Sequence, residues 1–121
     1  MAYNFGKHFE KEEFTCHCGC GGLDISQKLI DKLNTTRELL QKPIFINSGY
    51  RCLTHNRSVG STDTSSHVKG LAVDIKANNS VYRYELLKVL FFVGFNRIGI
   101  DKNFIHVDID DTKPQKITYL Y

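Results

Sequence analysis

Two short segments combine the alternation of a β-strand with side chains that bind metal ions, and they restrict the fold more than any other feature. In residues 71–76, Leu, Val and Ile alternate with Ala and Asp; in residues 104–109, Phe, His and Asp alternate with Ile and Val. Side chains two residues apart share one face of a strand. The pattern therefore predicts two strands, each with an apolar face, and places Asp74, His106 and Asp108 on polar faces that line a cleft.

His67, Asp74 and His106 form the candidate metal site. Imidazole nitrogen and carboxylate oxygen both suit zinc, and catalytic zinc sites keep three protein ligands and one open position. Gly70 lies between His67 and the predicted strand, where a residue without Cβ lets the chain turn so that His67 and Asp74 approach one ion. These residues predict one catalytic Zn²⁺ ion.

The remaining periodicity predicts an α+β fold with a small, mostly antiparallel sheet flanked by helices. Apolar spacing favours a helix over 25–41, capped by Asp24 or Ser26, and a largely buried helix over 81–93, capped by Asn79 or Ser80 and ended by Gly94. Strands are expected at 43–48, 71–76, 97–100, 104–109 and 116–121, and residues 49–64 are expected to form a long active-site loop.

Length and charge fit one small catalytic unit. The 121 residues are enough for a single domain over 1–121, and the net charge of +3 is too small and diffuse to indicate a nucleic-acid partner. The first eight residues lack the apolar run of a secretory signal, and no stretch has the length of a membrane span. We expect a monomer that is made in the cytoplasm.

A family resemblance extends this interpretation. Ser65-x-His67-x-x-Gly70-x-Ala72-x-Asp74 and the later His106-x-Asp108 resemble the zinc D-Ala-D-Ala carboxypeptidase family of murein peptidases, which shares its fold with the hedgehog signalling domain. The elements Ser48-Gly49-Tyr50-Arg51-Cys52 and His55-Asn56 are similar to the family as well. The cysteine-rich segment 14–22 looks like the opening of a short, mostly bacterial and phage-encoded branch.

The resemblance implies zinc-dependent hydrolysis of a peptidoglycan stem peptide or cross-link at a bond that involves D-alanine. Carboxypeptidase and endopeptidase activity both remain open, and so does cleavage between L-alanine and D-glutamate. An endolysin-like enzyme of this kind would reach the cell wall through a holin, through lysis or within a virion. A non-catalytic zinc-binding module of the same fold, used in virion structure or assembly, is the alternative.

The resemblance also suggests roles for single residues. Arg51 would bind a substrate carboxylate with Ser65 as a further contact, and Tyr50 would either pack or stabilise the oxyanion. Some branches place a catalytic carboxylate three residues before the second zinc histidine, where this chain has Asn103. Asp108 therefore becomes the candidate general base, with Asp101 as a substitute, although Asp108 could equally orient His106.

Four cysteines make up a separate group. Cys16, Cys18 and Cys20 alternate in sequence, and Cys52 follows Arg51. They could hold a second, structural metal ion, form disulfides or remain reduced thiols; the Cys-x-Cys-x-Cys spacing is shorter than that of most zinc knuckles. Either bonded state would tie the N-terminal segment to the region beside Arg51.

Overall fold

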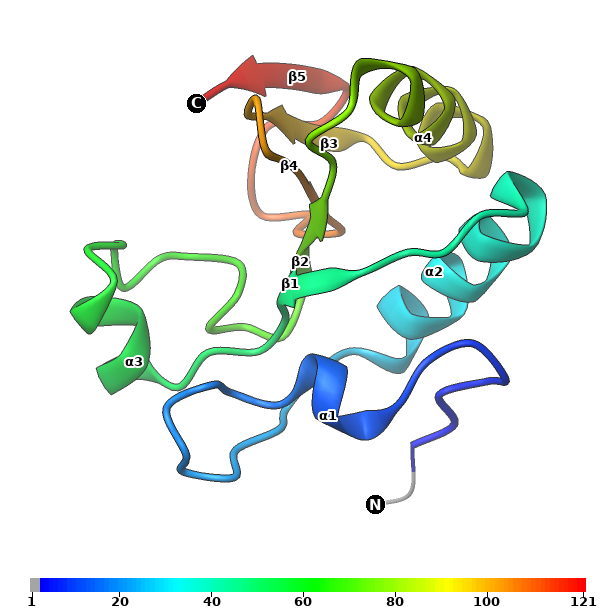
Figure 1. The fold of residues 1–121 in the computed structure, drawn as a ribbon. Helices are drawn as coiled ribbons and strands as arrows, with labels where there is room; N and C mark the ends of the chain where they lie inside the picture. The colour runs from blue at the N-terminus through cyan, green and yellow to red at the C-terminus, as the bar shows by residue number, and fades with distance from the viewer. Residues whose placement is uncertain (1–2) are drawn as a thin grey trace.

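The computed structural model describes residues 3–121, which fold as an α+β structure around one five-stranded sheet (Figure 1). The strands are β1 (Ile46–Ser48), β2 (Ala72–Lys76), β3 (Arg97–Ile100), β4 (Phe104–Asp108) and β5 (Ile117–Leu120). Their order across the sheet is β1-β2-β4-β3-β5, and all neighbours are antiparallel except β3 and β5. The predicted mostly antiparallel sheet is confirmed.

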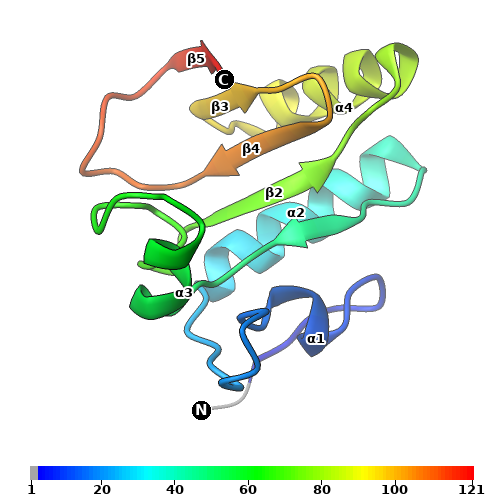
Figure 2. The same cartoon turned by 60° about the vertical axis from the view of Figure 1, so that its left-hand side comes forward.

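Two long helices, α2 (Gln27–Leu40) and α4 (Ser80–Val93), cover the same face of this sheet (Figure 2). Ser26 caps α2 by accepting from the Leu29 N–H, and Asn79 caps α4 by accepting from the N–H groups of Val81 and Tyr82. Gly94 ends α4 in the left-handed conformation at φ 97°. These capping positions were among those predicted.

The apolar rows of β2 and β4 form the centre of the core. Val73, Ile75, Ile105 and Val107 are fully buried together with Leu29, Leu33, Leu86 and Leu90 of the helices. Because successive strand residues alternate in direction, the Asp74, His106 and Asp108 side chains point to the opposite face. The sheet therefore separates an apolar layer from a polar one.

Three predictions about the elements were wrong, and one short helix was not predicted. The expected loop over 49–64 contains a helix, α3 (Leu53–Ser58), and another short helix, α1 (Lys11–Phe14), was not predicted. The first strand begins at Ile46 instead of residue 43. Helix α4 is not largely buried, because one side alone packs on the sheet, and Phe91 and Phe92 are 54% and 81% exposed. No helix within residues 3–121 combines the length and hydropathy needed to cross a bilayer.

Candidate metal centre

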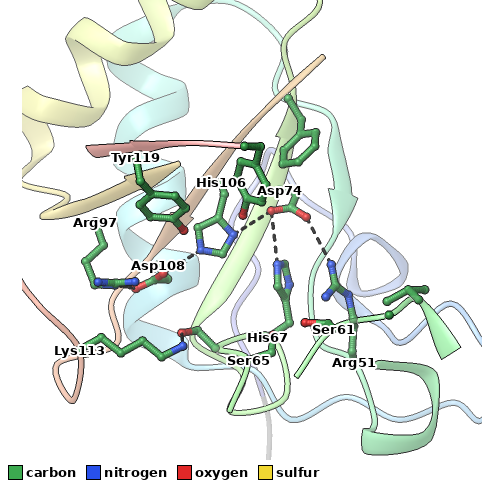
Figure 3. A pocket seen from close by; sticks show the side chains of 15 residues that line it. Arg51, Ser61, Ser65, His67, Asp74, Arg97, His106, Asp108, Lys113 and Tyr119 are labelled. Atoms are coloured by element: carbon green, nitrogen blue, oxygen red, sulfur yellow. Dashed lines mark hydrogen bonds and ion pairs between the residues drawn. The ribbon is translucent and has the colours of Figure 1, made fainter. Parts of the chain in front are cut away.

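The three predicted ligands come together on the polar face of the sheet (Figure 3). Asp74 on β2 and His106 on β4 are direct partners in the antiparallel register, while His67 comes from the turn that precedes β2. The Asp74 Oδ1 atom lies 2.9 Å from His106 Nδ1 and 3.3 Å from His67 Nε2. One ligand atom from each residue lies within 4.8 Å of the others, so a single ion can contact all three.

Gly70 makes the approach of His67 to β2 possible. Its φ of +72° lies in the left-handed region, and a Cβ at this position would overlap the Asp24 carbonyl oxygen. The Gly70 carbonyl accepts a hydrogen bond of 2.8 Å from the Ser26 N–H, which fixes the turn against the start of α2. The predicted need for glycine is therefore confirmed, and close packing against residue 24 adds to it.

Each imidazole is oriented by a hydrogen bond on its outer nitrogen. His67 Nδ1 lies 2.8 Å from the Gly49 carbonyl oxygen, and His106 Nε2 lies 2.7 Å from Asp108 Oδ2. The Gly49 carbonyl can only accept, so His67 Nδ1 carries the proton and Nε2 directs a lone pair toward Asp74. His106 lies between two carboxylates, and binding of a cation through Nδ1 would leave its proton on Nε2 beside Asp108. In that state the two imidazole nitrogens and the Asp74 carboxylate would present three electron-pair donors to one ion, and this donor set fits zinc.

The electrostatics of the site also favour positive charge. Burial alone would raise the pKa of Asp74, but the neighbouring imidazoles of His106 and His67 hold that pKa below its usual range. Burial would likewise lower the pKa of His106, but hydrogen bonds with Asp108 and Asp74 raise it. Both shifts come from the pairing of these side chains, because the two carboxylates stabilise positive charge on the imidazole between them.

Asp108 is enclosed by protein donors. Besides His106, it receives a 2.7 Å bond from Arg97 Nε and a 3.1 Å bond from the Asp110 N–H, and its side chain is only 1% exposed. Arg97 is the direct partner of Asp108 in the β3–β4 register and also donates to the Pro114 carbonyl at 2.6 Å. Of the two roles left open by the sequence, orientation of His106 is the one that these contacts support.

A cavity of about 510 Å³ opens over the three ligands. Arg51 lines it and donates to Ser48 Oγ at 3.1 Å, to Asn56 Oδ1 at 3.2 Å and to Asp74 Oδ2 at 3.4 Å. These bonds use three of the five guanidinium N–H groups, which leaves two donors for another partner. Asn56 is fully buried and also donates to the Thr62 carbonyl, so it supports the position of Arg51.

The cavity wall contains further residues that sequence reasoning missed. Lys113, Tyr119 and Tyr121 line it, and the Lys113 ammonium donates to Ser66 Oγ at 2.9 Å. Ser65 lines the cavity as the predicted contact would require. Among the residues described by the structure, the cavity lining does not include Tyr50, Asp101 or Asn103. The alternation of Tyr119 and Tyr121 marked one strand face, but the pairing of β5 was needed to place that face at the site.

Away from the cavity, the four cysteines form the second group suited to a metal ion. The sulfur atoms of Cys16, Cys18, Cys20 and Cys52 all lie within 4.8 Å of one another, and none of the four is in a disulfide. Their predicted clustering is therefore confirmed. Tyr50 lies on this side of the molecule, close to Gly22.

Comparison with known proteins agrees with this arrangement. Residues 7–108 match the family model described as Peptidase M15, a segment that includes all three candidate ligands and all four cysteines. No curated protein matched the chain. The family is D-Ala-D-Ala carboxypeptidase-like and has the hedgehog/DD-peptidase fold, as the resemblance implied. By its match over most of its length, the chain belongs to the peptidase M15 family.

Proposed function

We propose that this protein is a zinc-dependent peptidase that hydrolyses peptidoglycan stem peptides or cross-links at a bond involving D-alanine. The observation that carries the proposal is the convergence of His67, Asp74 and His106 beneath an open cavity. Membership in the peptidase M15 family supports hydrolysis of a peptide, and the donor set supports zinc.

Different residues of the site would bind the metal ion and the substrate. His67, Asp74 and His106 would hold zinc, which supplies a Lewis acid for the scissile carbonyl and lowers the pKa of water. Arg51 keeps two free donors at the cavity and would bind a substrate carboxylate in a fixed orientation. Lys113 adds a second positive charge to the same cavity.

We assign Asp108 to positioning. It holds the His106 proton on Nε2 and thereby keeps Nδ1 available as a ligand. General-base catalysis by Asp108 remains a prediction from the sequence, since it would require a carboxylate bonded to His106, Arg97 and the Asp110 N–H to accept a proton from the cavity.

The decisive experiment is mass spectrometry of purified sacculi and isolated muropeptides after incubation with zinc-loaded protein. Release of free D-alanine would identify a carboxypeptidase, conversion of cross-linked dimers to monomers an endopeptidase, and separation of L-alanine from D-glutamate the third activity. The His67→Ala variant is the matched control and should leave every muropeptide intact.

A non-catalytic zinc-binding module is the competing proposal. Its support is that both carboxylates among the described cavity-lining residues, Asp74 and Asp108, already bind other side chains, while Asn103 stands where some relatives have a carboxylate. Intact muropeptides after incubation with the zinc-loaded wild type would favour this module over the peptidase.

Delivery to the substrate is a further part of the proposal. The net charge of +3 is compatible with an anionic cell wall. We propose that protein made in the cytoplasm reaches the wall through a holin, through lysis or within a virion.

A further inference from the structure

The four cysteine sulfurs lie at the separations of a metal tetrathiolate. Cys18 Sγ is 3.5 Å from Cys16 Sγ and 3.6 Å from Cys52 Sγ, and Cys20 Sγ lies within 4.8 Å of all three. A tetrahedral zinc ion with sulfur ligands at about 2.3 Å holds those sulfurs about 3.8 Å apart. Two disulfides would instead group the sulfurs into pairs at about 2.0 Å.

We infer that Cys16, Cys18, Cys20 and Cys52 bind one structural zinc ion, separate from the ion held by His67, Asp74 and His106. Four ligands fill the tetrahedral coordination and leave no open position, as in structural zinc sites. Soft thiolate ligands also select zinc over magnesium or calcium. This inference does not depend on which peptide bond the enzyme cleaves.

The conformation of the cysteine loop explains how cysteines in a Cys-x-Cys-x-Cys sequence can contact one ion. In an extended strand, three alternating cysteines would point the same way at separations of about 7 Å, too far apart for one ion. Here Gly19 and Gly21 adopt φ values of +88° and +74°, and the Cys16 N–H donates to the Gly22 carbonyl at 2.9 Å. The chain closes into a compact loop, which brings the alternating sulfurs together.

Backbone N–H groups point at three of the four sulfurs. The Cys52 N–H donates to Cys16 Sγ at 3.4 Å, the His55 N–H to Cys52 Sγ at 3.4 Å and the Gly22 N–H to Cys20 Sγ at 3.3 Å. Such outer-sphere donors offset the negative charge of thiolates and fix their orientation around an ion. Each donor therefore serves a cluster of thiolates better than a set of neutral thiols.

The cluster is connected to the other metal centre through the segment 49–52. The Tyr50 N–H bonds to the Phe14 carbonyl at 3.0 Å, and a Cβ at Gly49 would lie 2.9 Å from Phe14 Cα, so the N-terminal segment packs directly on this turn. The Gly49 carbonyl orients His67, and the Arg51 N–H bonds to the His67 carbonyl at 3.2 Å. An ion that joins Cys52 to the N-terminal loop would therefore hold the turn that positions His67 and Arg51.

Metal analysis and cobalt substitution test this inference. The wild type should contain two zinc ions. Cys20→Ser should keep only the ion at His67, Asp74 and His106, and His67→Ala should keep only the ion at the cysteines. His17→Ala is the control: His17 lies in the same loop but outside the cluster, and two ions should remain. Cobalt-substituted wild type and His67→Ala should both show intense sulfur-to-cobalt charge-transfer bands, which Cys20→Ser should lose.

A second measurement covers the case in which Cys20→Ser fails to fold. Titration of wild-type protein with an organomercurial should release one equivalent of zinc in step with the loss of four thiols, and X-ray absorption should show zinc–sulfur distances of about 2.3 Å. Alkylation of the denatured, unreduced protein at fewer than four cysteines would overturn the inference in favour of disulfides. Four free thiols without mercurial-releasable zinc would overturn it in favour of reduced cysteines.

Discussion

Replacement of Asp108 by asparagine distinguishes positioning from proton transfer. If the oxygen of the new side-chain amide accepted from Arg97, its NH₂ group would face His106 Nε2 and force the imidazole proton onto Nδ1, the atom that faces Asp74. If the NH₂ group faced Arg97 instead, two donors would meet at a side chain that is only 1% exposed, and the Arg97 N–H would lose its acceptor. Either orientation disturbs the site.

The size of the effect follows from these contacts. Loss of a group that orients a metal-bound histidine lowers metal affinity by about 10- to 100-fold, which corresponds to about 1.4–2.8 kcal/mol. Arg97 is only 7% exposed, so weakening its buried ion pair should also lower the free energy of unfolding, by up to about 3–5 kcal/mol if the partner is lost completely.

Zinc affinity should be measured by competition with a chromophoric chelator, with any cysteine-bound ion counted separately by mercurial release. Asp101→Asn is the matched control, because the Asp101 carboxylate accepts from the Asn103 N–H at 2.9 Å and does not line the cavity. It should keep wild-type zinc affinity and turnover. Wild-type zinc affinity and stability in Asp108→Asn, together with lost turnover, would refute positioning and establish Asp108 as the general base.

Three further predictions concern the turn, the cavity and the acid limit of stability. Gly70→Ala should lower the free energy of unfolding, measured in urea, by about 2–5 kcal/mol, because the new Cβ would combine a left-handed φ with overlap of the Asp24 carbonyl. Gly60→Ala is the control: its φ is also left-handed, but its Cβ would meet no atom within 4 Å, so it should cost about 1–2 kcal/mol. Equal losses in the two variants would contradict the overlap argument. Arg51→Ala should reduce kcat/KM about 10- to 100-fold more for a peptide with a free terminal carboxylate than for the same peptide with a terminal amide. Arg57→Ala, which removes an exposed arginine paired with Asp63, should reduce kcat/KM equally for both peptides. An unchanged preference for the free carboxylate in Arg51→Ala would show that Arg51 does not bind it. Burial alone would raise the pKa of Asp110, but hydrogen bonds from Thr112, Ser66 and Lys69 hold that pKa below its usual range. The ionised carboxylate therefore stabilises the fold at neutral pH, and this contribution is lost as the pH falls below about 4. Urea midpoints of Asp110→Asn and wild type should therefore differ most at neutral pH and converge in acid; a constant difference would exclude this linkage.

Local patterns were enough to predict the two central strands and the candidate ligands. The two-residue period of segments 71–76 and 104–109 fixes which side chains share a face, irrespective of the rest of the chain. The caps Ser26 and Asn79 are also local, because a side chain there reaches N–H groups within three residues. Asp74 and His106 could be predicted because they lie on these two strands, and His67 because its motif directly precedes the first of them.

Features set by distant contacts could not be predicted in the same way. Helix α3 has only six residues, and its cap, Cys52, belongs to the cysteine cluster. Exposure of Phe91 and Phe92 depends on which side of α4 meets the sheet, and a helix that is apolar on all sides does not specify that. Likewise, the Arg97–Asp108 contact requires the β3–β4 register, which the motif His106-x-Asp108 does not contain.

The parallel edge strand β5 contributes to the shape of the cavity but supplies none of the candidate metal ligands. The candidate ligands belong to β2, β4 and the turn before β2, whereas Tyr119 lies on β5 and Tyr121 directly follows it. Among the described strands, β5 pairs with β3 alone, and it lies beyond the segment matched by the family model. Substitutions at these tyrosines can therefore reshape one wall without removing a candidate ligand. Their ring centroids lie 6.1 and 6.3 Å from that of His106, so a replacement has to preserve this packing. For the proposed peptidase, residues 117–121 are therefore the place to redirect cleavage toward peptides of other sizes, by selection or by design.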